Sequence, residues 1–370
     1  MYDITIVGGG PAGATLARLL GDRYRVLLLE RRPREPSAVA SERKACGGLL
    51  NPDAVRAFQR LGVSLPASLT VQPQPGAVTA IDLDSRRVRR YQRDYRNLDR
   101  EALDRFLLSL LPDSTELRWE ARLTGLEPAA GNSRVCWSEQ GVLRTAPTRV
   151  VVGADGAASL VRRSRFGSPA MASRYLALQA WFPRTALRLP EGSADDYASL
   201  FAREVTDFYG WIIPKDQRAV IGAAIPIAGN GRNLGRAAPR FRHLLQLISA
   251  AGYLNPAAEV QLSGMEAAQL LRPSPDDLVT GDAEVGLIGE AAGLVSPSSA
   301  EGFSWALASA VAAATALSSG IPGWSVRYGR LCLPLRRRLR LKQLKSRVLY
   351  VPSVRGTVLA SGIGSLHQAR

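Results

Sequence analysis

A glycine-rich turn between a short apolar strand and a helix is the feature that most constrains the fold of this chain. Residues 4–7 predict a buried strand, Gly8-Gly9-Gly10-Pro11-Ala12-Gly13 follows at once, and residues 14–20 predict a helix. A second apolar run ends on Glu30, about twenty residues further on. In this pattern the glycines allow a tight turn, close approach of a pyrophosphate and close helix–strand packing. The turn therefore predicts a Rossmann-like dinucleotide site, with phosphates at the helix N-terminus and ribose hydroxyls on Glu30.

Two later segments repeat the pattern of a buried strand that ends in a glycine turn. Residues 150–152 lead into Gly153-Ala154-Asp155-Gly156, and residues 285–288 lead into Gly289-Glu290. Ala300-Glu301-Gly302 then opens an uncharged helix, whose N-terminal dipole can face the flavin edge where negative charge gathers on reduction. FAD and NAD share the first fingerprint, and the order and spacing of all three segments favour FAD.

These motifs together resemble the FAD-dependent oxidoreductases of the p-hydroxybenzoate hydroxylase fold, and within them the geranylgeranyl reductase family. The resemblance runs from residue 3 to about residue 348 and is strongest toward the CbrA-type bacterial oxidoreductases. Besides the glycine turns, it rests on Cys46-Gly47-Gly48-Leu49-Leu50 and on Tyr209-Gly210-Trp211-Ile212-Ile213-Pro214-Lys215. The chain departs from the family where Gly289-Glu290 replaces Gly-Asp and where Ala300-Glu301-Gly302 replaces Gly-Glu-Gly.

The resemblance implies an FAD site and a substrate site. The residues expected to bind FAD are Gly8, Gly10, Ala12, Gly13, Glu30, Arg31, Arg100, Asp155, Gly156, Gly289, Glu290 and Gly302. The residues expected to bind the substrate are Gly47, Gly48, Tyr209, Trp211 and Pro297.

Cys46 is the expected catalytic residue, since the resemblance turns it toward the substrate. Its thiol can donate a proton to a substrate carbon after hydride arrives from the flavin. Other interpretations stay open: Cys46 as a small loop residue, Tyr209 and Trp211 as core aromatics of a sheet, and Arg100 as a helix-surface partner of Asp104.

The predicted fold class is α/β. A Rossmann-like FAD-binding domain is expected over residues 1–70, 97–165 and 277–322, with an inserted antiparallel β-sheet substrate domain over 71–96 and 166–276. Residues 323–370 are expected to form a basic helical C-terminal segment. The stretch 303–321 is uncharged for 19 residues, and its place after a flavin motif favours a buried core helix over a membrane span.

Charge is concentrated at the C-terminus. The net charge of +16 comes from 48 basic and 32 acidic residues, yet no acid follows Glu301, whereas 11 basic residues do. Leu335, Leu339, Leu341, Leu344 and Val348 do not form one helical stripe, which predicts a poor amphipathic helix. This segment is a candidate for contact with anionic membrane on its cytoplasmic face, and a solvated arginine-rich surface is the alternative. Nucleic acid is not expected, because no recognised binding motif accompanies the charge.

Other counts exclude several classes of chemistry. Two histidines and three widely spaced cysteines argue against a metal site and favour a reducing compartment. No signal peptide precedes the first strand, so a cytoplasmic protein is expected. The protein is also expected to be a monomer.

The expected activity is that of an FAD-dependent oxidoreductase that reduces carbon–carbon double bonds of an apolar, isoprenoid lipid substrate. NAD(P)H or another reductant would be the external electron donor. One alternative is a monooxygenase or halogenase acting on an aromatic substrate. A halogenase needs a lysine to hold the oxidised halide. Lys44 and Lys215 are the candidates outside the C-terminal segment 323–370. The other alternative is a membrane-peripheral flavin electron carrier.

Overall fold

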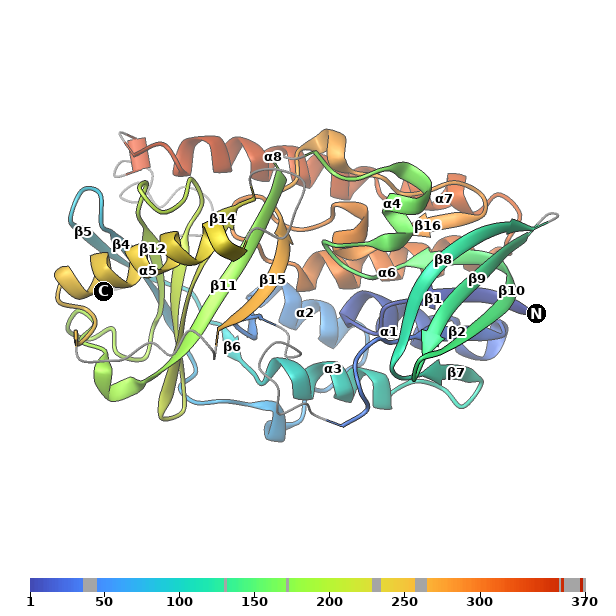
Figure 1. Ribbon diagram of the computed structural model, residues 1–370, viewed down its shortest axis with the longest axis horizontal. Helices are drawn as coiled ribbons and strands as arrows, with labels where there is room; N and C mark the ends of the chain where they lie inside the picture. The colour runs from blue at the N-terminus through green and yellow to red at the C-terminus, as the bar shows by residue number, and fades with distance from the viewer. Residues whose placement is uncertain are drawn as a thin grey trace. The chain divides into compact units, whose positions relative to one another are not determined.

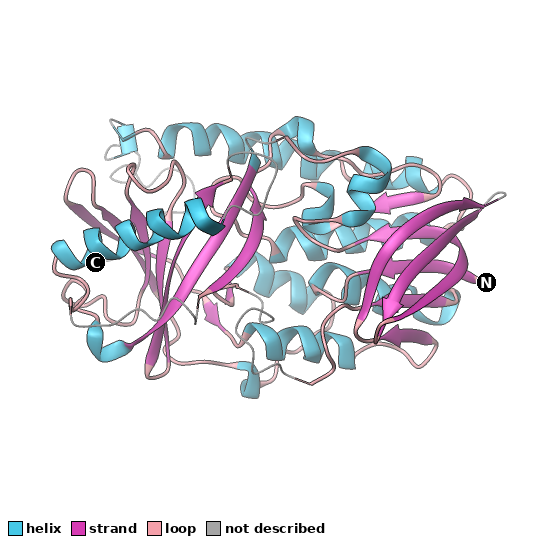
Figure 2. Ribbon diagram, in the orientation of Figure 1, coloured by secondary structure: helices cyan, strands magenta, loops and turns pink. Residues whose placement is uncertain are grey.

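The computed structural model describes residues 1–35, 45–129, 132–170, 173–227, 234–256, 265–352, 354–355 and 367–368. The chain forms two compact units (Figures 1 and 2). The first unit contains Met1–Ala38, Glu101–Ser173 and Leu271–Gln343, and the second contains Val39–Arg100, Arg174–Leu270 and Leu344–Arg370.

A mixed sheet forms the centre of the first unit. Its strands follow the order β7-β2-β1-β10-β9-β8, and β16 pairs with β10. Strands β7, β2, β1, β10 and β16 run parallel, whereas β8, β9 and the start of β10 form an antiparallel meander. The bounds are β1 Tyr2–Val7, β2 Val26–Leu29, β7 Thr115–Arg118, β8 Ala121–Ala129, β9 Asn132–Glu139, β10 Val142–Gly153 and β16 Val285–Leu287.

The parallel arrangement explains why the sequence motifs converge. Gly8, Glu30, Ala154 and Ile288 each follow the last residue of a parallel strand, so the predicted cofactor segments share one edge of the sheet. The helices of this unit are α1 Pro11–Leu20, α4 Leu160–Phe166, α6 Phe303–Ser318, α7 Trp324–Leu331, α3 Arg100–Ser109 from Glu101 on, and α8 Leu333–Leu349 up to Gln343. Short 3-10 turns lie at Gly21–Arg23, Pro275–Asp277 and Gly289–Ala292.

The uncharged segment 303–321 forms α6, which is largely buried, as the sequence predicts. Trp305, Ala310 and Leu317 belong to its buried side. No helix in the described part of the chain has both the length and the apolarity that crossing a membrane requires.

An eight-stranded sheet forms the second unit, in the order β15-β11-β14-β13-β12-β4-β5-β17. The pairs β11–β14, β14–β13, β13–β12, β4–β5 and β5–β17 are antiparallel, whereas β12–β4 is parallel. The bounds are β4 Ala77–Asp82, β5 Arg87–Gln92, β11 Arg174–Pro183, β12 Tyr197–Phe201, β13 Gly210–Lys215, β14 Arg218–Pro226, β15 Glu266–Leu271 and β17 His367–Gln368. Smaller elements are β3 Leu49–Leu50, β6 Arg96–Asn97, α2 Pro52–Arg60 and the 3-10 turns Ala67–Leu69 and Arg184–Ala186.

Helix α5, Leu234–Ala250, covers one face of this sheet (yellow in Figure 1). Its Phe241 and Leu244 pack in one apolar cluster with Ile212 and Ile221 of β13 and β14. Because side chains alternate along a strand, Trp211, Ile213 and Lys215 lie on the opposite face of the sheet.

The boundaries of the two units differ from the expected domain boundaries. Residues 39–70, expected in the FAD-binding domain, belong to the second unit, where β3 pairs with β6. The C-terminal segment is divided between the units after Gln343 rather than standing apart, because Leu335 and Leu339 join the apolar core of the first unit. Residues 166–173 and 271–276 likewise belong to the first unit. These shifts follow from tertiary contacts that local patterns do not report.

Candidate functional site

The glycine turn after β1 has the geometry that a pyrophosphate requires. A Cβ on Gly13 would overlap the carbonyl oxygen of Gly8, and a Cβ on Gly8 would lie 2.6 Å from the carbonyl oxygen of Ala154. Gly10 is different, since the space around its Cβ position is open. Gly10 also begins α1 without a side-chain cap, so the first N–H groups of this helix remain for a ligand.

Glu30 lies directly beside this turn. Its carboxylate accepts the backbone N–H groups of Gly9 at 2.9 Å and Arg32 at 2.8 Å, and the guanidinium of Arg32 at 3.1 and 3.2 Å. Burial opposes the charge of Glu30, but Arg32 outweighs burial and holds the pKa of this carboxyl below its ordinary value. Four donors fill the usual capacity of a carboxylate, so a ribose hydroxyl would have to replace one of them.

Arg32 is a residue that the sequence interpretation missed. Its guanidinium also bonds Asp104 of α3 at 2.7 Å, so Arg32 joins the end of β2 to α3. The neighbouring Arg31, expected to bind FAD, is exposed. The carboxylate of Asp104 thus pairs with Arg32.

Asp155 follows β10 and has an unsatisfied oxygen. Its Oδ2 accepts the backbone N–H groups of Leu160 at 2.7 Å and Val161 at 3.3 Å. Its Oδ1 is buried and has no hydrogen-bond partner among the described residues. Burial raises the pKa of this carboxyl. The next residue, Gly156, has a φ of +75° and open space at its Cβ position.

The third glycine segment packs against the first. Gly289 has a φ of +58°, and a Cβ there would lie 3.1 Å from the Cβ of Ala12 in α1. Its N–H donates to Ser309 Oγ at 2.9 Å. The carboxylate of Glu290 accepts the backbone N–H of Leu271 at 2.9 Å, so the longer acid at this position bonds the protein chain itself.

The turn before α6 also departs from what the motif implied. Glu301 accepts the backbone N–H of Ser304 at 2.7 Å and its hydroxyl at 2.6 Å, so an acid caps the helix that starts after Gly302. Ala300 has a φ of +49°, in the left-handed region that favours glycine. Pro297 is buried in the same turn.

The first unit fits an FAD on these observations. It offers an open backbone at Gly10, an uncapped helix start and an unpartnered buried oxygen on Asp155. Gly10 and the first N–H groups of α1 would hold the pyrophosphate, Gly8 and Gly13 allow the close packing of the turn, and Glu30 with Arg32 would contact the ribose end. Bound FAD supplies two-electron redox chemistry that no side chain of the protein can provide.

The loop Cys46-Gly47-Gly48 belongs to the second unit, where strand β13 holds it in place. A Cβ on Gly47 would overlap Ile213 Cδ1 of β13. Gly48 has a φ of +64°, and a Cβ there would overlap the carbonyl oxygen of Leu98. Glycine is therefore required at both positions, and the loop lies against the sheet face that carries Ile213.

Two cations lie near the thiol of Cys46. The guanidinium Nη1 of Arg100 lies 3.8 Å from Cys46 Sγ, within hydrogen-bond range of sulfur. Lys215, only 8% exposed, donates from Nζ to Asn97 Oδ1 at 2.7 Å and to the carbonyl of Leu98 at 2.8 Å. Burial outweighs the attraction of nearby Cys46 and lowers the pKa of Lys215 to about 8. The structure thus places Arg100, expected at the FAD, beside Cys46.

Tyr209 and Trp211 form an aromatic surface on the same face of the sheet. Their ring centroids are 5.9 Å apart in an edge-to-face arrangement. The indole of Trp211 lies over Gly222 of β14, because a Cβ at that position would overlap the ring. The indole Nε1 is buried and has no hydrogen-bond partner among the described residues.

Gln179 and Glu266 form a buried polar pair, which the sequence did not indicate, on the sheet face that carries Trp211. Strand register places Gln179 of β11 and Trp211 of β13 opposite Gly222, one on each side. Gln179 Nε2 donates to Glu266 Oε2 at 2.6 Å, and Trp181 Nε1 donates to Glu266 Oε1 at 2.9 Å. Like Trp211 Nε1, the Oε1 of Gln179 is a buried atom that has no partner in the described ranges.

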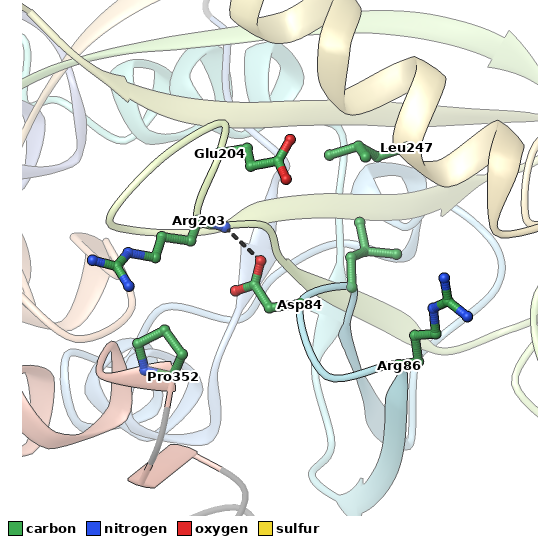
Figure 3. Close-up of a pocket in the computed structure, with 7 residues that line it drawn as sticks. Asp84, Arg86, Arg203, Glu204, Leu247 and Pro352 are labelled. Atoms are coloured by element: carbon green, nitrogen blue, oxygen red, sulfur yellow. Dashed lines mark hydrogen bonds between the residues drawn. The ribbon is translucent and has the colours of Figure 1, made fainter.

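A hollow of about 640 Å³ elsewhere in the second unit contains none of the expected site residues (Figure 3). Its lining residues are Leu83, Asp84, Arg86, Arg203, Glu204, Leu247 and Pro352. Asp84 accepts the backbone N–H of Arg203 at 2.9 Å, as the dashed line shows. The lining mixes two acids with two cations and lacks the aromatic face, so we assign the site to the Cys46 loop instead.

The lowered pKa of Lys215 should make the free energy of unfolding depend on pH. Its pKa is about 8 in the folded protein and 10.5 when unperturbed, so between these values the unfolded chain binds more protons. The free energy of unfolding should therefore rise with pH across this interval, by up to about 1.4 kcal/mol per pH unit. Urea unfolding at a series of pH values should show this slope in the wild type and not in Lys215→Met. Lys342→Met of α8 is the control and should keep the slope; an equal slope in Lys215→Met would contradict the assignment.

The fold and these residues define an FAD-binding flavoprotein. The chain belongs to the FAD-binding domain family, whose model matches residues 1–329. It is 34% identical over 370 residues to the protein CbrA of Escherichia coli O9:H4 (strain HS), covering 100% of this chain and 96% of the relative. The CbrA protein of Shigella sonnei (strain Ss046) is also 34% identical, with 99% of its length covered. The expected family and the expected FAD cofactor are thereby confirmed.

Solved structures share the fold at low identity. A geranylgeranyl bacteriochlorophyll reductase-like protein of Thermoplasma acidophilum has a TM-score of 0.78 at 18% identity, with 97% of this chain and 90% of that chain covered. The flavin-dependent brominase Bmp2 has a TM-score of 0.68 at 17% identity, with 98% and 94% covered. Pseudomonas aeruginosa PqsL in complex with 2-aminobenzoylacetate has a TM-score of 0.64 at 20% identity, with 98% of each chain covered. The predicted α/β flavoenzyme fold is confirmed.

Proposed function

We propose that this FAD-dependent oxidoreductase saturates a carbon–carbon double bond in an apolar, prenyl-type substrate. Reduced FAD supplies the hydride, with its two electrons, to one alkene carbon. The thiol of Cys46 donates its proton to the adjacent carbon and is then reprotonated from solvent. One new C–H bond therefore uses a hydride, the other uses a proton, and the double bond is consumed.

The observation that carries this proposal is the pair of cations beside Cys46. When the thiol gives up its proton, negative charge develops on Sγ. Arg100 at 3.8 Å can donate a hydrogen bond to that sulfur, and the Lys215 ammonium adds favourable electrostatics. Both groups act more strongly after proton donation than before it, which is the requirement for assisting the step.

The surroundings of Cys46 favour a largely apolar substrate with one polar group. Ile213, Trp211 and Tyr209 supply an apolar and aromatic surface on the face that holds the Cys46 loop. The unpartnered Trp211 Nε1 and Gln179 Oε1 offer one donor and one acceptor at that surface. A prenyl chain that carries a hydroxyl meets both conditions, and the likeness to the Thermoplasma acidophilum reductase-like protein supports this choice.

A second candidate is a monooxygenase or halogenase acting on an aromatic substrate. The Tyr209–Trp211 pair could equally hold an aromatic ring, and the fold is shared with a brominase and with PqsL. For a halogenase lysine the structure offers less support. The Nζ of Lys215 already donates to Asn97 and Leu98, and Lys44 lies outside the described residues.

An anaerobic single-turnover assay distinguishes the two candidates. The FAD-loaded protein is reduced with dithionite, mixed with geranylgeraniol, and the product is analysed by mass spectrometry. The proposal expects reoxidation of the flavin coupled to the gain of two hydrogens per reduced double bond. If the flavin reoxidises only with oxygen, and an aromatic compound is hydroxylated or halogenated in the process, the reductase proposal is wrong.

A further inference from the structure

Helix α8 presents apolar side chains on two separate faces. Leu335 and Leu339 point inward, and Leu339 is 0% exposed. Leu341, Leu344 and Val348 are instead 68%, 58% and 46% exposed, at the spacing i, i+3, i+7 that places them on one side of a helix. The apolar residues of α8 therefore do not form one stripe, as the sequence predicts, but the outward ones form a stripe of their own.

Cations lie on the same side of the helix as this stripe. We define the outer face of α8 by its exposed residues Leu333, Arg337, Arg340, Leu341, Leu344, Arg347 and Val348. No acidic residue occurs after Glu301, so the outer face has no acid from its own helix to neutralise it. The outer face thus combines exposed apolar surface with concentrated positive charge. An exposed apolar patch with a polar rim is typical of an interaction site.

We propose that the outer face of α8 docks on the surface of an anionic lipid membrane. An amphipathic helix lying in the plane of a membrane buries its apolar side chains among acyl chains and places its cations at the headgroups. Arginine adds to this arrangement because its stem packs along apolar surface while the guanidinium reaches phosphate. The charge complementarity selects anionic over neutral lipid, and the leucine stripe selects a lipid surface over a purely polyanionic partner. This proposal does not depend on the proposed reaction.

Vesicle flotation of the FAD-loaded, full-length protein tests the docking. We expect the protein to float with vesicles of phosphatidylcholine and phosphatidylglycerol, to remain behind with phosphatidylcholine alone, and to be released by salt. Each interfacial cation contributes about 1 kcal/mol, so Arg337→Gln/Arg340→Gln/Arg347→Gln should lower the partition coefficient on the order of 100-fold. Leu341→Ser/Leu344→Ser/Val348→Ser keeps every charge and should lower it by on the order of 100-fold or more.

Matched controls test whether binding to vesicles requires the outer face of α8 itself or only the protein's overall charge and exposed apolar surface. Arg60→Gln/Arg87→Gln/Arg89→Gln removes three exposed arginines elsewhere, and Val142→Ser/Leu143→Ser removes two exposed apolar side chains from the start of β10. Both controls should float like the wild type, and retained FAD and unchanged circular dichroism show that each variant is folded. The proposal is overturned if the wild type ignores anionic vesicles, if the leucine variant binds as tightly as the wild type, or if the protein binds double-stranded DNA but not vesicles.

Discussion

Cys46→Ala is expected to slow saturation of the substrate double bond on the order of 100-fold or more in a single turnover. The variant removes the proton donor, whereas the residues expected to hold FAD in the first unit are untouched. Stopped-flow reduction of the flavin should therefore proceed at the wild-type rate, and only its substrate-dependent reoxidation should slow. This combination separates a lost proton donor from a damaged cofactor site.

Cys136→Ala is the matched control for this prediction. Cys136 is also a free cysteine, half-buried in β9 of the first unit. It should retain the wild-type rate of reoxidation. If Cys46→Ala also retains that rate, then Cys46 is a loop residue and a water or another side chain supplies the proton. The reduction proposal itself would survive that result, because product analysis tests it separately.

Gly10→Ala should weaken FAD binding, whereas Gly13→Ala should destabilise the fold, although only two residues separate the two positions. Gly10 has open space at its Cβ position and a φ of −73°, so alanine fits the protein without FAD. Its methyl group would occupy space needed by the pyrophosphate, and the dissociation constant of FAD should rise on the order of 100-fold. Gly13→Ala would force a methyl group into the Gly8 carbonyl, which should destabilise the protein by roughly 3 kcal/mol even without FAD.

Two measurements on the apoproteins distinguish these outcomes. Urea unfolding should show Gly10→Ala within about 0.5 kcal/mol of the wild type and Gly13→Ala clearly less stable. Titration with FAD, followed by quenching of flavin fluorescence, gives the dissociation constants. Tight FAD binding by Gly10→Ala would mean that the cofactor does not approach the backbone at this turn.

The cofactor-binding part of the fold was readable from sequence because its signals are local. Gly8, Gly10, Gly13 and Glu30 stand within one strand–turn–helix–strand segment, and each is constrained by neighbours in that segment. Even there the sequence could not show that Arg32 would use the lone pairs of Glu30. That bond depends on which rotamer a flexible side chain adopts, and the spacing of residues does not determine it.

The candidate substrate site was only partly readable, because it is built from distant segments. Tyr209 and Trp211 alternate along one strand and were found for that reason. Gln179 and Glu266 come together only through strand register, and Lys215 meets Asn97 across a gap of 118 residues. Such pairings depend on the tertiary fold, and no local pattern marks them.

Helix α8 carries an outward apolar stripe that its sequence pattern hides. A helix with apolar residues on two faces shows little net amphipathicity, because the contributions of the two faces oppose each other. From sequence alone, α8 therefore shows no apolar stripe. Burial separates Leu335 and Leu339 from Leu341, Leu344 and Val348, and only then does the outward stripe become visible.

The bare backbone of Gly222 beneath Trp211 has a consequence for how this enzyme could diversify. The indole lies flat on that strand only because residue 222 has no side chain. A single codon change there would lift the ring away from the sheet and alter the room available to a substrate, while Cys46, Arg100 and Lys215 would be untouched. Gly222 is thus a position at which one substitution should reshape the proposed substrate surface without touching the proposed proton donor.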